Sequence, residues 1–76
     1  MITVFTTSSC AYCVMVKKFL LMKGKEFEVV NLEDNPEARQ SLFEKTGAMT
    51  VPQTRIGDKI IVGWNPGAIV SALATI

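Results

Sequence analysis

The first third of the chain shows two patterns of apolar and polar residues, first one that is typical of a strand and then one that is typical of a helix. A short apolar run over residues 2–6 predicts a strand, and three polar residues then interrupt it. Over residues 11–23 the apolar side chains recur at the spacing of one helix face. Gly24 stands where such a helix would be capped. The side chains that recur at this spacing are Tyr12, Val16, Phe19 and Leu20, and Tyr12 could either be half packed on the helix or flank the sulfur of Cys10.

The middle of the chain repeats this order of strand and helix. Apolar and polar residues alternate over 26–32, which predicts a second strand. Asn35-Pro36 combines a helix N-cap with proline at the first helical position, so a helix is expected from there to Lys45, ended by Gly47. The expected inward side chains are Phe27, Val29 and Leu32 in the strand and Ala38 and Leu42 in the helix.

The last third predicts a hairpin and one more helix. Residues 53–56 and 59–62 have the character of strands, and the Gly-Asp pair at 57–58 suits a two-residue turn between them. Asn65-Pro66 repeats the cap signal and predicts a final helix. Its expected inward residues are Ile69, Leu73 and Ile76.

The predicted element order is therefore β-α-β-α-β-β-α. The first βαβ unit requires parallel strands with a right-handed crossover, whereas the closing hairpin is antiparallel. We expect an α/β fold with a four-stranded mixed sheet and three helices, in a single domain over residues 1–76.

Charge and composition narrow the classes of function. Eight Lys and Arg against seven Asp and Glu leave no basic field for nucleic acid. Apolar runs such as Phe19 to Met22 are too short to span a membrane, and the first residues lack the pattern of a secretory signal. We therefore expect a monomeric cytoplasmic protein that binds neither nucleic acid nor membrane.

The two cysteines lie together in the segment Cys10-Ala11-Tyr12-Cys13, and the chain has no histidine. A bridge between them closes so small a loop that it would stabilise the fold little, so chemistry explains the pair better than structure does. Cys10 would open the helix that begins at residue 11, where the free N–H groups and the helix dipole favour a thiolate. The thiolate is the attacking species in disulfide exchange. We expect Cys10 to attack and Cys13, one turn further in, to resolve the mixed disulfide.

Other roles for the two cysteines remain possible. The two cysteines could be ordinary small buried residues of the first helical turn. A zinc site needs four ligands and would require two chains, since the sequence offers only these two thiols and no histidine. An iron–sulfur cluster bridged between two chains is the alternative function that uses the same thiolates.

Val51-Pro52 precedes the strand at 53–56, and its role can be interpreted in two ways. Proline cannot lie inside a central strand, so Pro52 could simply mark the strand entrance. In the functional reading the bond is cis and lies against the Cys10–Cys13 pair. The backbone N–H and carbonyl of Val51 would then face solvent and could pair with an extended substrate.

Taken together, these segments resemble the glutaredoxin family over essentially the whole chain. The matching pieces are Val4-Phe5-Thr6, Cys10-Ala11-Tyr12-Cys13, Thr50-Val51-Pro52-Gln53 and Val62-Gly63-Trp64. The resemblance implies a thioredoxin fold, redox-active Cys10 and Cys13, and electron transport without a bound cofactor. It also implies a cis-Pro52 and a substrate or glutathione site at Tyr12, Thr50, Val51 and Pro52, with Gly63 and Trp64 near the same groove.

Departures from the family pattern bear on the electron donor. Many glutaredoxins have a lysine where this chain has Thr7, and acidic residues where it has Asn65-Pro66, and both charges hold glutathione. Ala11 replaces the common proline, as in cluster-binding variants. The order Gly63-Trp64-Asn65-Pro66 is more similar to the NrdH-redoxins, which take electrons from thioredoxin reductase and NADPH. The resemblance thus implies reduction of protein disulfides or glutathione mixed disulfides, with thioredoxin reductase favoured over glutathione as donor and ribonucleotide reductase as a candidate target.

Overall fold

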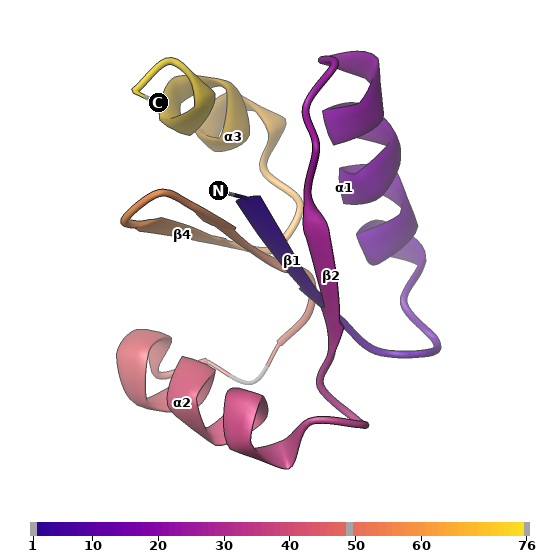
Figure 1. Ribbon diagram of the computed structural model, residues 1–76, viewed down its shortest axis with the longest axis vertical. Helices are drawn as coiled ribbons and strands as arrows, with labels where there is room; N and C mark the ends of the chain where they lie inside the picture. The colour runs from indigo at the N-terminus through magenta and orange to yellow at the C-terminus, as the bar shows by residue number, and fades with distance from the viewer. Residues whose placement is uncertain (1, 49, 76) are drawn as a thin grey trace.

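The computed structural model describes residues 2–48 and 50–75, and its elements follow the predicted order (Figure 1). The elements are β1 (Ile2–Thr6), α1 (Ala11–Met22), β2 (Glu28–Asn31), α2 (Pro36–Thr46), β3 (Gln53–Ile56), β4 (Lys59–Val62) and α3 (Pro66–Leu73). The expected inward position of Ile76 lies outside the described residues. Within the described ranges, no helix has the length and apolar character needed to cross a membrane.

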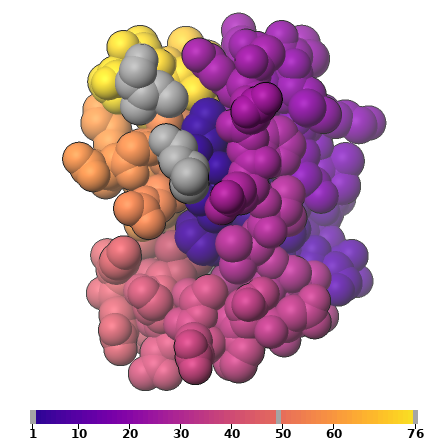
Figure 2. All heavy atoms as spheres, in the orientation of Figure 1, coloured from indigo at the N-terminus to yellow at the C-terminus, as the bar shows by residue number. Residues whose placement is uncertain are grey.

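The four strands form one mixed sheet in the order β2-β1-β3-β4. β1 pairs with β2 in parallel and with β3 antiparallel, and β3 and β4 form the antiparallel hairpin, so the predicted sheet is confirmed. α1 and α3 cover one face and α2 lies on the other (Figure 1). Figure 2 shows the indigo atoms of the first strand enclosed between the segment that contains β2 and the orange hairpin. β1 is therefore central, and the chain leaves its end to enter α1.

The larger part of the core lies between the sheet and the pair α1 and α3. Alternate residues of β1 point to this face, and β3 and β4 contribute from their paired positions. The buried cluster consists of Ile2, Val4, Val16, Leu20, Ile56, Ile61, Ile69 and Ala72. On the opposite face Phe5 lies near the inner residues Ala38 and Leu42 of α2. Both faces of the central strand are thus covered.

The predicted helix ends are formed by the expected residues. Gly24 has φ +69°, and the bonds from its N–H to Leu21 O and from the N–H of Lys25 to Leu20 O make a Schellman motif after α1. Gly47 ends α2 in the same left-handed conformation. Asn65 caps α3 by accepting a hydrogen bond from the N–H of Ala68. Asn35 occupies the N-cap of α2, but its side chain donates to Asn31 O instead.

Several details differ from the sequence predictions, and one is that α2 ends at Thr46 and not at Lys45. β2 is shorter than expected, and Val29 is 49% exposed because β2 is an edge strand with a neighbour on one side only. Tyr12 is 57% exposed, because Cys13 and not Tyr12 takes the inward position of the first turn of α1. α1 ends at Met22, one residue earlier than expected.

Candidate active site

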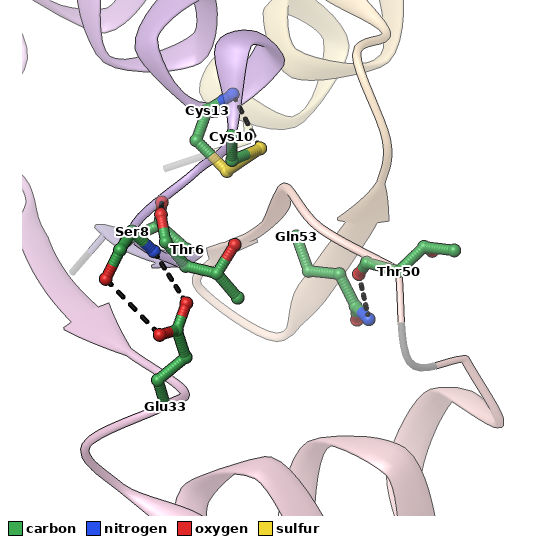
Figure 3. Close-up of a disulfide and its surroundings, with 8 residues drawn as sticks. Thr6, Ser8, Cys10, Cys13, Glu33, Thr50 and Gln53 are labelled. Carbon is green, nitrogen blue, oxygen red and sulfur yellow. Dashed lines mark hydrogen bonds between the residues drawn. A yellow bond between two sulfur atoms is a disulfide. The ribbon is translucent and has the colours of Figure 1, made fainter.

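The two cysteines lie at the N-terminal end of α1 and are joined as a disulfide, with Cα atoms 5.2 Å apart (Figure 3). Cys10 is the N-cap residue, and its Sγ accepts a hydrogen bond of 3.2 Å from the backbone N–H of Cys13. Cys10 is half-buried, whereas Cys13 is only 1% exposed. A substrate arriving from solvent would therefore meet Cys10 before Cys13.

The surroundings of Cys10 favour negative charge on its sulfur. Its Sγ lies at the positive end of a helix of twelve residues, and no acidic side chain in the first turn opposes that end. The N–H of Cys13 is one of the donors that a helix start leaves without a backbone partner. An N-cap sulfur that already accepts this bond would be stabilised further as a thiolate.

The sheet brings three separate segments to this end of the molecule. The chain leaves β1 after Thr6 and reaches Cys10 four residues later. The carbonyl of Thr6 accepts a bond of 2.8 Å from the N–H of Leu32, so the end of β2 lies beside it. Phe5 is paired with Gln53, which places the start of β3 on the other side. The Thr50–Pro52 segment, residues 50–52, therefore enters the sheet next to the exit of β1.

Pro52 and Gly63, two of the predicted site residues, are in contact in the structure. The Val51–Pro52 peptide bond is cis, and the carbonyl of Pro52 accepts a bond of 2.8 Å from the N–H of Gly63. Gly63 has φ +83°, a conformation that favours glycine. Thr50 is exposed and Val51 is half-buried. Among the described residues, the backbone N–H and carbonyl of Val51 have no hydrogen-bond partner.

Trp64 directly follows Gly63, and its side chain lies against α1. Its ring packs edge-to-face on Phe19, with the centroids 5.7 Å apart. The two rings line an apolar hollow along α1, and no residue of the Thr50–Pro52 segment takes part in it. The other lining residues are Met15, Lys18 and Met22. Trp64 lies between β4 and α3, where the chain passes to the α1 side of the sheet.

Two polar residues that the sequence analysis did not select hold the segments on either side of Cys10. The Glu33 carboxylate accepts from the backbone N–H of Ser8 at 2.9 Å and from its hydroxyl at 3.4 Å. Gln53 donates from Nε2 to Ala48 O at 3.1 Å and to Thr50 O at 2.9 Å. Figure 3 shows the two pairs on opposite sides of the chain end that carries the disulfide. Glu33 gives no sequence signal, because 25 positions separate it from Ser8, but a polar residue opening a central strand could have marked Gln53.

The potential for metal binding rests on the cysteine pair. In the parts of the chain that the structure describes, no cluster of three or more His, Cys, Asp or Glu side chains could hold a metal ion. Cys10 and Cys13 would supply two sulfur ligands, and a four-coordinate site would need the rest from elsewhere.

Comparison with known proteins agrees with this geometry. The sequence model of the glutaredoxin family matches residues 2–61. Over 62 residues the chain is 37% identical to a glutaredoxin from Pseudomonas aeruginosa, which covers 82% of this chain and 74% of that protein. It spans a smaller share, 59% to 64%, of several plant glutaredoxins that it also matches.

Two solved structures are similar in fold and sequence. The glutaredoxin-like protein NrdH-redoxin from Escherichia coli has a TM-score of 0.84 and 30% identity, over 92% of this chain and 91% of that one. A buckwheat glutaredoxin–glutathione complex has a TM-score of 0.80 and 30% identity, over 97% of this chain and 76% of that one. These matches confirm the predicted thioredoxin fold.

Proposed function

The chain belongs to the glutaredoxin family, and from that premise we propose that it is a dithiol oxidoreductase that reduces protein disulfides or glutathione mixed disulfides. The observation that carries the proposal is the asymmetry of the cysteine pair. The half-buried Cys10 caps α1 and accepts the N–H of Cys13, while the Cys13 side chain is buried behind it. This asymmetry supports Cys10 as the nucleophile and Cys13 as the resolving residue.

The reaction proceeds in two exchanges. The Cys10 thiolate attacks one sulfur of the substrate disulfide, forms a mixed disulfide and releases the other substrate sulfur as a thiolate. The thiolate of Cys13 then attacks the Cys10 sulfur, which forms the Cys10–Cys13 disulfide and releases the second substrate sulfur. The substrate gains two electrons and takes up two protons from water as its thiols form, and the protein loses the same two electrons.

A thiol reductant must return the pair to the dithiol state. Two glutathione molecules could do so and leave glutathione disulfide, or a thioredoxin-reductase-type enzyme could supply the electrons of NADPH. Thr7 and Asn65-Pro66 offer no charge for the ends of glutathione, and a charge-assisted hydrogen bond is roughly twice as strong as a neutral one. Together with the likeness to NrdH-redoxin, this favours the reductase as donor.

The same considerations suggest the partners. The unpartnered backbone groups of Val51 suit an extended protein segment, and Thr50 and Tyr12 are both exposed. Ribonucleotide reductase is proposed as a target on the likeness to NrdH-redoxin alone. Because the pair must be kept reduced, we place the protein in the cytoplasm.

Cysteine variants test the roles of the two thiols. Cys10→Ser should abolish reduction of a peptide that carries a glutathione mixed disulfide, since no other group can attack. Cys13→Ser should accumulate a covalent adduct on Cys10, visible by mass spectrometry of the intact protein. An adduct on Cys13 in the Cys10→Ser variant, with full turnover, would reverse the assignment. A freshly purified brown protein with visible absorbance that reduces no disulfide would replace the proposal with the cluster-binding alternative.

The donor is tested by reducing the oxidised protein with each system in turn. Trp64 is the only tryptophan and packs on α1, so its fluorescence can report the change of redox state. We expect thioredoxin reductase with NADPH to reduce the protein faster than glutathione with glutathione reductase. Efficient turnover with glutathione and none with thioredoxin reductase would overturn the donor assignment and leave the oxidoreductase function in place.

A further inference from the structure

Gln53 is the first residue of β3, and its side chain turns back toward the segment that precedes Pro52 (Figure 3). Its Nε2 donates to the carbonyl oxygens of both Ala48 and Thr50. Carbonyl oxygens only accept, so the NH₂ end of the amide must be the end that faces them. The Gln53 side chain is 0% exposed, and its two bonds are therefore shielded from competing water.

Thr46, in the last turn of α2, also forms hydrogen bonds with the segment that leads to Pro52. Its hydroxyl donates to Leu42 O at 3.0 Å in the last turn of α2, and the hydroxyl oxygen accepts from the N–H of Ala48 at 3.2 Å. Ala48 is thus held through its N–H by α2, and its carbonyl accepts from Gln53 of β3 at 3.1 Å and also lies 3.4 Å from the Thr46 hydroxyl. The chain that leads from α2 to the Thr50–Pro52 segment is anchored at both elements.

The unpartnered end of the Gln53 amide shows that packing alone does not explain this residue. Among the described residues, the buried Gln53 Oε1 has no hydrogen-bond partner. A buried polar atom without a partner is unfavourable, and an apolar side chain of similar size would fill the position without that penalty. What only the amide supplies is its pair of N–H donors, and both are directed at the backbone on the way to Val51.

We propose that Gln53 is a positioning residue for the disulfide substrate. It does not touch the substrate or either sulfur. By holding the Thr50 carbonyl it fixes the peptide unit that also contains the Val51 N–H, and this unit in turn orients the Val51 carbonyl, so that both groups can pair with an extended substrate backbone. The inference rests on the proposed oxidoreductase function and adds the residue that prepares its binding segment.

The test compares two substrates in one variant. Gln53→Met keeps the side-chain length and apolar packing but removes both donors. With a peptide that carries a glutathione mixed disulfide, KM should rise about tenfold, which corresponds to the loss of one to two hydrogen bonds, while kcat changes little. With an aromatic disulfide that has no peptide backbone, kcat/KM should stay within about twofold. The rate at which iodoacetamide alkylates Cys10 should also stay the same.

Thr54→Val is the matched control. Thr54 is the next residue along β3, is equally buried, and carries a hydroxyl that has no partner among the described residues. It is paired with Val4 on the opposite face of the sheet, so its replacement should leave the KM for the peptide unchanged. If Gln53→Met does not fold, Thr46→Val, which releases Ala48 from α2, should raise the same KM.

The outcomes separate this inference from the proposed function. A wild-type protein that reduces neither disulfide would defeat the proposed function itself. With an active wild type, an unchanged peptide KM in Gln53→Met would overturn the role of Gln53. An equal loss on both substrates would overturn it too, because that pattern belongs to a general structural defect.

Discussion

The Thr7–Ser9 segment before Cys10 and the Thr50–Pro52 segment before β3 reach the same end of the sheet, yet they are held by different means. Ser8 is tied at the surface by the exposed carboxylate of Glu33. The carbonyl of Thr50 is tied from the interior by the neutral amide of Gln53, which is fully buried. The segment before Cys10 is therefore held by a solvent-exposed carboxylate, and the segment before β3 is held by a buried amide.

This difference indicates which side of the site should tolerate substitutions. Water and salt compete with a surface contact, so its net contribution is small and its removal leaves no orphaned group in the interior. A buried hydrogen bond contributes modestly when made, but loss of the Gln53 amide takes from the Thr50 carbonyl the donor that it has among the described residues. We expect the Gln53 side to be intolerant of change and the Glu33 side to be permissive.

The largest effect is expected from Gln53→Glu, which keeps the shape but sets a carboxylate against two carbonyl oxygens. An unpaired charge in this buried position should lower the free energy of unfolding by about 3–5 kcal/mol. Burial favours the protonated form, so the pKa of the introduced carboxyl would be higher in the folded than in the unfolded state. The stability of the variant relative to wild type should therefore fall as the pH rises from 5 to 8. Urea unfolding at both pH values measures this.

Gln53→Met is the control for that measurement, since it introduces no titrating group. Its stability relative to wild type should not depend on pH. Equal stability of Gln53→Glu at pH 5 and pH 8, within 1 kcal/mol of wild type, would show that the position is not shielded and would remove the contrast between the two sides.

An intermediate effect is expected from Gly63→Ala, beside the interior-tied segment. An added Cβ would meet no atom within 4 Å, so crowding is not the cause. The cause is the backbone: φ is +83°, and an L-residue in the left-handed region loses about 1–2 kcal/mol. Thermal unfolding should show this loss, together with a raised KM as the bond to Pro52 O weakens.

Gly67→Ala, four residues further along the chain, is expected to raise the stability and not to lower it. Gly67 lies in α3 with an ordinary φ, and an added Cβ would make only normal contact, 3.7 Å from Asn65 Oδ1. Alanine in a helix is favoured over glycine by up to about 1 kcal/mol, so this variant should be more stable than wild type. Destabilisation by both substitutions would contradict the conformational explanation for Gly63.

The smallest effect is expected from Glu33→Ala, on the surface-tied side. Loss of the bonds to Ser8 should lower the free energy of unfolding by less than about 1 kcal/mol, and less in 1 M salt than in dilute buffer. Glu33→Gln keeps an acceptor for the Ser8 N–H and should be closer still to wild type. A KM increase in Glu33→Ala as large as that in Gln53→Met would show that both sides are equally critical.

Much of the fold was predictable because its signals are local. The strand limits at 2–6, 53–56 and 59–62 agree with the structure, and so do the glycine ends of α1 and α2. The position of Cys10 at the helix start was also predictable, since only a few residues separate it from β1. Val29 was placed wrongly and the packing of Tyr12 stayed open, because the exposure of these residues depends on which strand is at the edge and on how α1 sits on the sheet.

The sequence by itself thus determined the order of elements, the family and the pair of sulfurs, through caps, turns and spacings that act within a few residues. The tertiary structure alone decided what surrounds that pair. Glu33 meets Ser8 across 25 positions, Gln53 is buried because β3 pairs with β1 on one side and β4 on the other, and Trp64 packs on Phe19 from across the chain. Each of these contacts depends on the register of the sheet and the seating of a helix. Those are properties of the whole assembled core, to which every strand contributes, and no short stretch of sequence carries them.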